Sequence, residues 1–266
     1  MTQPITERRR HALKFRLATV VSNERITPKM ARVTLQTPDF ADFTSDAYDD
    51  HVKLFFAPAG TELTLPEPGP NGMVFPEGTE RPPARDYTPR RIDLAKGEVV
   101  FDFVLHGDGP AASWAETAAP GDKLGVGGPR ASFVVADVFD WYLLVGDETA
   151  LPAIGRRIEE LPTGKRIIAF IEVADAAEIQ PLSVPGDKLE LHWVNRSDAN
   201  APSLIEQVRA ANLPEGNGYA FIAGEAVMST TLRDYLVETL GWDADRIKAA
   251  GYWRQGDSDF DDGHAH

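Results

Sequence analysis

The chain contains 266 residues with a formal net charge of -14 at pH 7; 42% of the residues are hydrophobic and 26% are charged. This length suits two domains of ordinary size, each able to bury a core. The absence of cysteine excludes disulfides, thiolate metal sites and cysteine-ligated iron–sulfur clusters, and the acidic balance argues against nonspecific nucleic-acid binding.

The sequence pattern indicates neither a membrane span nor a secretory segment. No run approaches the roughly 18 uncharged apolar residues that a membrane-spanning helix needs. The basic residues Arg8, Arg9 and Arg10 have no apolar segment behind them, unlike the pattern of a signal peptide. We therefore expect a cytoplasmic protein without a membrane anchor, in which residues 8–10 form a solvated leader rather than a nucleic-acid-binding arm.

The first half of the chain predicts short strands separated by turns. Residues 32–35 alternate polar and apolar side chains, as in a strand with one buried face. Strands are expected at 16–23, 31–37, 51–56, around Arg85, at 99–105 and near 123–125, with a short helix starting at Ser113. Residues 58–83 are rich in Pro, Gly and Glu and are expected to form a long surface loop. Together these features predict a small antiparallel barrel.

In the second half, apolar runs alternate with helical stretches. Strands are expected at 141–145, 166–173, 188–194, 218–223 and 246–252, and helices at 149–161, 203–212 and 226–240. This alternation predicts a parallel sheet covered by helices on both faces. We predict a β-barrel domain at 1–135, an α/β domain at 136–256 and a disordered acidic tail at 257–266.

The segment RDYTPR (85–90) offers several contacts for a flat dinucleotide. On an extended chain, Arg85 and Tyr87 share one face while Thr88 points to the other. Arginine supplies a planar fork of donors that suits a pyrophosphate, tyrosine a ring and a hydroxyl, and threonine a short polar group for the edge of a heterocycle. The alternative interpretation is an ordinary strand with a solvated arginine that ends at Pro89.

A second motif follows about twenty residues later, where the apolar run 99–105 ends in the loop HGDGP (106–110). A helix that starts at Ser113 with a serine cap would provide a natural seat for phosphate oxygens. A Gly-Pro turn before a helix is also common without any ligand.

In this order, the two motifs resemble those of the ferredoxin-reductase-like flavoproteins, and more closely those of the siderophore-interacting protein family, which are FAD-dependent ferric-siderophore reductases. The resemblance extends from about residue 15 to 256 and includes PGD (120–122), GP (128–129), GDETALPA (146–153), IEVAD (171–175), AGE (223–225) and GYWR (251–254). It implies a FAD-binding antiparallel barrel followed by a nicotinamide-binding α/β domain, as in ferredoxin–NADP reductase. The residues that the resemblance implies for FAD are Arg85, Tyr87, Thr88, Asp102, Val104, His106, Pro110, Ala112 and Ser113.

The segment GDET (146–149) follows the first strand of the predicted parallel sheet. Ligands of such sheets gather beyond the carboxyl ends of the strands, where the strand order reverses. The segment lacks a glycine-rich fingerprint, so by itself it predicts only a strand–helix turn with Thr149 as N-cap and acidic residues favoured by the helix dipole. The resemblance makes it a nicotinamide site, for which it implies Asp147, Thr149, Ala150 and Glu225.

Arg196 lies in the segment NRS (195–197), after the third strand of the predicted sheet. Ferredoxin-reductase relatives hold the 2′-phosphate of NADPH here with a serine and an arginine. The resemblance therefore makes Arg196 the candidate for a preference for NADPH over NADH, and a solvated loop arginine is the alternative.

The implied reaction consists of two transfers. NAD(P)H gives a hydride to flavin N5 in a cleft between the domains, and the reduced flavin passes single electrons to Fe(III) in its siderophore. Because siderophore oxygens hold Fe(II) more weakly than Fe(III), reduction also releases the iron. Outer-sphere electron transfer needs no acid–base residue at the substrate, so we expect neither a catalytic triad nor a metal site in the protein.

Ferric catecholates are anionic, and the resemblance supports a basic substrate pocket. We select Lys53, Arg130 and Arg254 as its members, although each residue alone suits an ordinary surface ion pair. Tyr252 and Trp253 are expected either to pack in an aromatic core or to cover the flavin ring.

Three alternatives remain at this point. The acceptor of a flavin reductase could be a quinone or a free ferric chelate; the protein could be a non-catalytic siderophore or flavin carrier; and, since the nicotinamide fingerprint is missing, reduced ferredoxin could be the donor.

Overall fold

The computed structural model describes residues 5–58, 61–70, 72–107, 109–182, 188–257 and 260. The chain divides into two compact units: the barrel unit comprises Glu7–Val134, and the α/β unit comprises Val135–His266 together with Met1–Thr6. Most of the tail predicted at 257–266, as well as Asp108 of the second motif, lies outside the described residues. No helix in the described ranges combines the length and apolar character that crossing a membrane requires.

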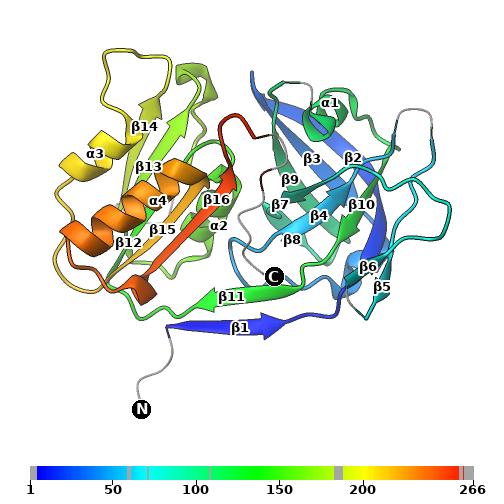
Figure 1. Cartoon of the computed structure of the whole chain (residues 1–266), viewed down its shortest axis with the longest axis horizontal. Helices are drawn as coiled ribbons and strands as arrows, with labels where there is room; N and C mark the ends of the chain where they lie inside the picture. Colours follow the sequence, from blue (N-terminus) through cyan, green and yellow to red (C-terminus); the bar gives the residue numbers. More distant parts are fainter. Residues whose placement is uncertain are drawn as a thin grey trace. The chain divides into compact units, whose positions relative to one another are not determined.

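The barrel unit contains a seven-stranded antiparallel sheet (Figure 1). In spatial order its strands are β7 (Ala84–Tyr87), β4 (Val52–Phe55), β10 (Lys123–Gly127), β2 (Phe15–Thr27), β3 (Met30–Gln36), β9 (Glu98–Val104) and β8 (Arg91–Asp93). Only Thr88, Pro89 and Arg90 join the two edge strands, β7 and β8. This link spans at most about 14 Å, whereas six strand spacings in a flat sheet would separate the edges by about 29 Å. The sheet is therefore rolled into the predicted barrel.

The apolar faces of these strands form the core of the barrel unit. On β3, Val33 and Leu35 are fully buried, while the intervening Thr34 is only half-buried. The core also contains Phe101 and Phe103 of β9, and each fully buried side chain of this size stabilises the fold by about 1.5–3 kcal/mol. Helix α1 (Pro110–Thr117) packs against this core through small buried residues. The second motif is thereby fixed to the rigid part of the unit.

Two segments of the barrel unit differ from the sequence prediction. The predicted loop at 58–83 contains a hairpin, β5 (Glu67–Gly69) with β6 (Gly72–Val74), whose three-residue strands are too short to show a periodicity. The predicted leader at 8–10 belongs to β1 (Thr6–Arg10), which pairs with β11 (Ala131–Val135). This strand is exposed along its whole length, so no apolar alternation marks it.

The α/β unit contains five parallel strands, as the sequence predicts. In spatial order they are β14 (Leu189–Asn195), β13 (Arg166–Val173), β12 (Trp141–Gly146), β15 (Gly218–Glu225) and β16 (Ile247–Trp253). The chain moves outward from β12 to β14 and then returns to the other side of β12. The strand order therefore reverses between β12 and β15, where Gly146 pairs with Ala223.

Helices cover both faces of this sheet (Figure 1). The helical elements of the α/β unit are α2 (Leu151–Glu160), η2 (Ala176–Glu178), α3 (Leu204–Ala210), α4 (Ala226–Asp234), the π-helical turn η3 (Tyr235–Thr239) and η4 (Ala244–Arg246), whereas η1 (Pro38–Asp42) belongs to the barrel unit. Leu143 and Val145 of β12 lie in one apolar cluster with residues of α3 and α4. Tyr142 points to the opposite face, where the guanidinium of Arg157 from α2 lies 4.8 Å from the centre of its ring.

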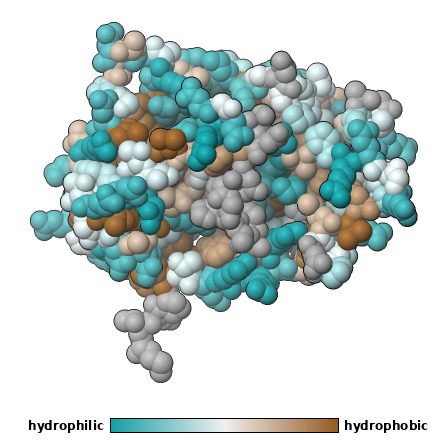
Figure 2. Space-filling model, in the orientation of Figure 1, coloured by the Kyte–Doolittle hydropathy of each residue, from teal (hydrophilic) through white to brown (hydrophobic). Residues whose placement is uncertain are grey.

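The surface shown in Figure 2 is largely hydrophilic, and its hydrophobic residues form small separate patches. This distribution agrees with a chain in which 26% of the residues are charged. Scattered exposed apolar residues are usual on protein surfaces.

Candidate functional site

The motif 85–90 lies at an edge of the rolled sheet. Arg85 and Tyr87 are both half-buried on β7, whereas Asp86 between them is exposed, as expected for an alternating strand. The ring of Tyr87 packs against Phe103 with 4.5 Å between the ring centroids. Burial raises the pKa of the Tyr87 hydroxyl. After the strand ends, Thr88 is buried within the link to β8.

Asp102 on β9 is engaged by arginines of the barrel unit. Its two carboxylate oxygens accept hydrogen bonds of 2.7 Å from Nε and Nη2 of Arg32, its cross-strand neighbour on β3. Nε of Arg90 lies 4.0 Å from the same carboxylate. The Asp102 side chain is 1% exposed, so it acts as a buried anchor for the arginine that follows Thr88 and Pro89. No local sequence pattern marks this network, because Arg32 lies on β3, Asp102 on β9 and Arg90 in the link between β7 and β8.

Helix α1 begins at Pro110, three residues earlier than predicted, and its N-cap is Gly109. Ser113 is therefore not the cap: it lies exposed in the first turn, and its N–H donates to the carbonyl of Gly109. The correction has a local reason, since proline is favoured at the first helical position, where its missing N–H is not needed.

The start of α1 fits an anion. No side chain caps the helix at Gly109, and the N–H groups of Ala111 and Ala112 lie within the first turn, where an α-helix has no internal acceptors. His106 is exposed in the preceding loop, whereas Val104 is half-buried at the end of β9. Ser113 presents an exposed hydroxyl in the same turn, whereas Arg85 is half-buried on β7, where its Nη1 atom donates to the carbonyl of Ala84 at 2.9 Å.

In the α/β unit, Asp147 follows β12 at the point where the strand order reverses. Its Oδ1 atom accepts from N and Oγ1 of Thr149 at 2.8 and 2.5 Å, and its Oδ2 atom accepts from Glu225 N at 2.9 Å and Trp253 Nε1 at 2.8 Å. Only 2% of Asp147 is exposed, and this burial raises the pKa of its carboxyl. The residue holds the turn together instead of presenting its carboxylate to solvent.

Thr149 is not the predicted N-cap, because its hydroxyl bonds to Asp147. Helix α2 begins at Leu151, and its N-cap is Ala150, which is fully buried. Glu225 caps α4 through a hydrogen bond of 2.9 Å from Met228 N. These side chains therefore shape the backbone at the carboxyl edge of the sheet.

Two glycines bring main chain into close contact at this edge. A Cβ atom at Gly146 would lie 2.7 Å from the carbonyl oxygen of Ala223. Gly224 has a φ angle of 133°, which side chains rarely allow, and a Cβ atom there would lie 2.7 Å from Cγ of Asp147. The two glycines therefore allow the end of β12 and the turn after it to pack tightly against the end of β15.

Arg196 follows β14 and is held by two carboxylates. Its Nη1 and Nη2 atoms donate to Oε1 and Oε2 of Glu148 at 2.9 and 2.7 Å, and its Nε atom donates to Oε2 of Glu172 at 2.8 Å. These hydrogen bonds, with Glu148 contributing most, raise the pKa of Arg196. Arg196 is thus exposed, with 40% of its side chain accessible, and at the same time ion-paired. The two glutamates gave no sequence signal for this contact, because they lie 48 and 24 residues away.

The predicted substrate residues belong to both units. Lys53 on β4 makes an exposed ion pair with Asp86, with Nζ and Oδ1 at 2.8 Å. In the sheet, Lys53 lies opposite Gly127 of β10, and the exposed Arg130 follows Gly127 three residues later in the chain. The guanidinium of Arg254 lies 4.9 Å from the centre of the Phe260 ring in the α/β unit. Trp253 is 36% exposed and so does not belong to a buried aromatic core.

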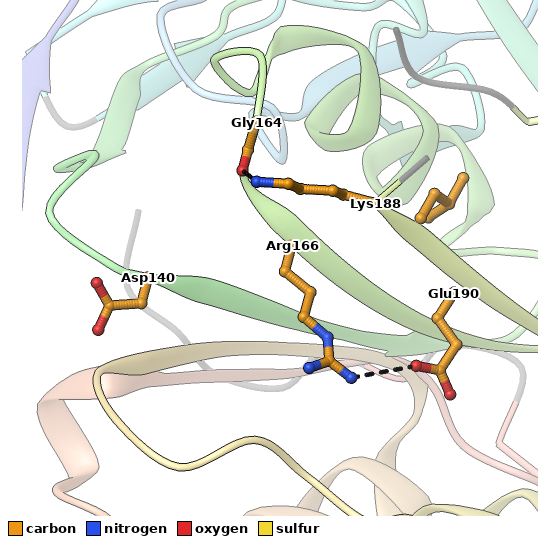
Figure 3. A pocket seen from close by; sticks show the side chains of 6 residues that line it. Asp140, Gly164, Arg166, Lys188 and Glu190 are labelled. Carbon is orange, nitrogen blue, oxygen red and sulfur yellow. Dashed lines mark hydrogen bonds and ion pairs between the residues drawn. The ribbon is translucent and has the colours of Figure 1, made fainter. Parts of the chain in front are cut away.

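A cavity of about 450 Å³ lies elsewhere, at the amino ends of the parallel strands, and Figure 3 shows the residues that line it. It is lined by Asp140, Gly164, Arg166, Lys188, Leu189 and Glu190. Its cations are engaged: Lys188 Nζ donates to the carbonyl of Gly164 at 2.7 Å, and Arg166 lies 3.6 Å from Glu190. Because ligands of open parallel sheets bind at the carboxyl ends, this cavity is separate from the predicted nicotinamide site.

Both units match the models of known protein families. Residues 19–133 match the model of the siderophore-interacting FAD-binding domain, and residues 139–256 match that of the siderophore-interacting protein. The NADPH-dependent ferric-chelate reductase of Escherichia coli K12 is 36% identical over 251 residues, which cover 93% of this chain and 96% of the relative. Ferric vibriobactin reductase ViuB of Vibrio cholerae is 31% identical over 246 residues, covering 91% and 90%.

Solved structures agree with this result. The siderophore utilization protein from T. fusca is 40% identical and superposes with a TM-score of 0.87, covering 96% of this chain and 98% of that one. Ferredoxin reductases of lower identity share the fold alone. With both units matched in the expected order, the chain belongs to the siderophore-interacting protein family.

Proposed function

We propose that this protein is a FAD-dependent ferric-siderophore reductase that draws its electrons from NAD(P)H in the cytoplasm, where nicotinamide nucleotides are regenerated. The observation that carries the proposal is the presence in one chain of two dinucleotide-type sites. One is the uncapped start of α1 beside a barrel, and the other is the carboxyl edge of a parallel sheet at its reversal point. The family and the named activities of the ferric-chelate and ferric vibriobactin reductases support it.

FAD would be held by the barrel unit. The first-turn amides of Ala111 and Ala112 and the fork of Arg85 would bind the pyrophosphate, and Ser113 and His106 would add donors at the same loop. Tyr87 would support the ring system from its place on Phe103, and Thr88 would meet the polar edge of a ring. Asp102 would act through Arg90, while Val104 and Pro110 would line the site with apolar surface. When bound, FAD supplies the ability to accept two electrons together and to release them one at a time.

The nicotinamide nucleotide would bind at the carboxyl edge of the α/β sheet. Asp147 and Thr149 fix the turn after β12, Ala150 closes it, and Glu225 fixes the start of α4. Gly146 and Gly224 let the chain pack closely at this edge, because a Cβ atom at either position would lie within 2.7 Å of neighbouring protein atoms.

Lys53, Arg130 and Arg254 would attract an anionic ferric siderophore. The ion pair of Lys53 with Asp86 has side chains that are 36% and 44% exposed, and exposed pairs contribute only about 0–1 kcal/mol. Lys53 can therefore exchange Asp86 for an anionic ligand at little cost. Reduction of the bound Fe(III) to Fe(II) weakens its hold on hard oxygen ligands and so releases the iron.

A stopped-flow experiment on the FAD-loaded protein tests the proposal. Anaerobic mixing with NADH, NADPH or reduced ferredoxin identifies the donor through bleaching of the flavin absorbance. A second mixing with ferric hydroxamate, ferric catecholate or a quinone then identifies the acceptor, with an Fe(II)-selective chelator reporting released iron. We expect bleaching by a nicotinamide nucleotide and reoxidation with release of Fe(II).

Other outcomes contradict the proposal in different ways. If the protein stays colourless after incubation with excess FAD, it does not bind the flavin, and the proposed reductase activity is wrong. If only reduced ferredoxin bleaches the flavin, the electron donor is ferredoxin and not NAD(P)H. If only the quinone reoxidises the flavin, the acceptor is a quinone and not a ferric siderophore. A flavin that no donor reduces indicates a carrier.

A further inference from the structure

Arg196, Glu148 and Glu172 form one cluster at the carboxyl edge of the α/β sheet, which we call the acidic clamp. The three residues lie at the ends of the adjacent strands β14, β12 and β13. Every guanidinium nitrogen of Arg196 donates to a carboxylate: two to Glu148 in a bidentate pair, and one to Glu172. Such charge-assisted bidentate pairs are among the stronger hydrogen-bonded contacts in proteins.

The position of the clamp matches the ribose end of a dinucleotide. In parallel nucleotide-binding sheets, an acidic residue about 20 residues after the first turn binds the ribose hydroxyls of NAD, whereas an arginine nearby accommodates the 2′-phosphate of NADP. Glu172 lies at the end of the second strand, β13, and follows the turn after β12. This chain therefore has both an acidic residue and an arginine at this position. The contacts between them determine which of the two a ligand can bind.

The charges of the clamp favour hydroxyls over a phosphate. Two carboxylates and one guanidinium leave a net charge of -1 on residues that are partly exposed, with 20% of the Glu148 side chain, 22% of Glu172 and 40% of Arg196 accessible. A phosphate monoester carries a charge of about -1.5 to -2 at pH 7. To reach Arg196, a 2′-phosphate would have to displace a glutamate that then lies beside it, and like charges at this distance repel. Ribose hydroxyls, in contrast, can donate to the free lone pairs of the carboxylates.

We propose that the acidic clamp of Glu148, Arg196 and Glu172 selects NADH over NADPH, with Glu172 and Glu148 accepting hydrogen bonds from the ribose of the adenosine. The inference rests on the proposed function, since it concerns the donor of that reaction. It replaces the sequence-based prediction that Arg196 favours NADPH. It also separates this chain from its Escherichia coli relative, which is named as NADPH-dependent.

Direct binding of adenosine nucleotides to the full-length protein tests this selection without any turnover. Isothermal titration calorimetry compares 5′-AMP with adenosine 2′,5′-bisphosphate, which adds the phosphate that distinguishes NADPH. We expect the wild-type protein to bind 5′-AMP at least about 10-fold more tightly, a difference of about 1.4 kcal/mol. The double variant Glu148→Gln/Glu172→Gln keeps the side-chain shapes and changes the clamp from -1 to +1. It should bind the bisphosphate at least about 10-fold more tightly than the wild-type protein does.

A matched variant controls for total charge. Glu190→Gln/Glu238→Gln changes the net charge of the α/β unit by the same amount, on residues outside the clamp, and should leave the ratio of the two affinities unchanged. If the double clamp variant proves poorly folded by its melting curve, Glu172→Gln alone keeps the bidentate pair with Glu148 and should shift the ratio in the same direction.

Two results overturn the inference, and they are distinguishable from each other. Tighter binding of the bisphosphate by the wild-type protein, with a ratio that the glutamine substitutions do not change, overturns the selection and leaves the reductase intact. Failure of both nucleotides and of NADH to bind overturns the selection together with the nicotinamide donor of the proposed function.

Discussion

Trp253 donates its indole N–H to the Oδ2 atom of Asp147 over 2.8 Å, although the two residues are 106 positions apart in the sequence. The same oxygen accepts from the backbone of Glu225, and the other oxygen accepts from Thr149. One buried carboxylate thus connects the ends of β12, β15 and β16. The backbone of the proposed nicotinamide site depends on this connection.

Substitution of Asp147 is expected to destabilise the α/β unit. In Asp147→Asn, an amide N–H₂ group replaces one acceptor oxygen and faces two donors, which should lower the free energy of unfolding by about 2–4 kcal/mol. Trp253→Phe removes a single hydrogen bond to a charged group and should cost less, about 1.5–3 kcal/mol. Urea unfolding followed by circular dichroism measures both. The exposed Asp198→Asn serves as control, and an Asp147→Asn protein with the wild-type midpoint would contradict this account.

Arg85 is predicted to contribute to FAD binding through its planar fork of donors. Loss of one charge-assisted bidentate contact in Arg85→Ala should raise the Kd for FAD about 10- to 100-fold. Arg85→Lys keeps the charge without the fork and should give an intermediate value. Titration of the apoprotein with FAD, followed by flavin fluorescence, gives the three constants. Arg91→Ala, on an exposed position of β8, is the matched control. Equal affinities of the wild-type protein and Arg85→Ala for FAD would show that Arg85 does not contribute to FAD binding.

The basic residues Lys53 and Arg254 are predicted to act on the iron substrate and not on the donor. The variant Lys53→Glu/Arg254→Glu should raise the KM for an anionic ferric catecholate about 10-fold, because it replaces attraction with repulsion. Flavin reduction by the nicotinamide nucleotide should keep its wild-type rate. A neutral ferric hydroxamate provides the internal control, since its KM should hardly change. If the KM for the catecholate also stays at the wild-type value, the substrate pocket lies elsewhere.

Asp42 is predicted to make part of the stability of the barrel unit depend on pH. Its carboxylate forms ion pairs with Lys14 and with Arg16, the latter at 2.8 Å, and these hydrogen bonds lower the pKa of Asp42 from 3.8 to about 2. Because the folded state binds this proton less tightly than the unfolded state, the stabilisation is complete above the unfolded pKa of 3.8. It is lost as the pH falls through the folded pKa of about 2.

Urea unfolding of wild-type protein and Asp42→Asn at pH 6, 5, 4 and 3 tests this dependence. The wild-type protein should be more stable at pH 6 and 5 by the same margin, and the margin should shrink at pH 3. A margin that stays constant down to pH 3, or grows there, would show that the ion pairs do not stabilise the fold in this way.

The sequence alone determined the elements whose signals are local. Strand β13 was predicted at its observed bounds, 166–173, because the apolar run at 167–171 marks it. A helix was predicted at 203–212, and α3 is observed at Leu204–Ala210, with Ser203 as its N-cap in a capping box with Glu206. The antiparallel-then-parallel organisation followed from the same local patterns, and the family was identified from short motifs in the correct order.

Local signals failed where a competing contact was also local but stronger. Thr149 was predicted to cap α2, yet its hydroxyl bonds to Asp147 two residues before it, so the helix starts later.

Strand β1 has an entirely exposed, basic sequence and forms because β11 offers it a partner, with Arg8 lying 5.3 Å from the centre of the Phe133 ring.

Only the tertiary structure decided how the candidate site residues are used. The sequence placed Arg196 after a strand of the nicotinamide domain, but its binding by Glu148 and Glu172 joins residues from three strands. The bond between Asp147 and Trp253 likewise depends on the order β12–β15–β16. Sequence neighbours fix periodicity and caps, because those depend on a few bonds along the chain. Which partners a buried or half-buried polar group contacts depends on which strands fold side by side, and so does the net charge of the cluster that they form. No local pattern contains that information.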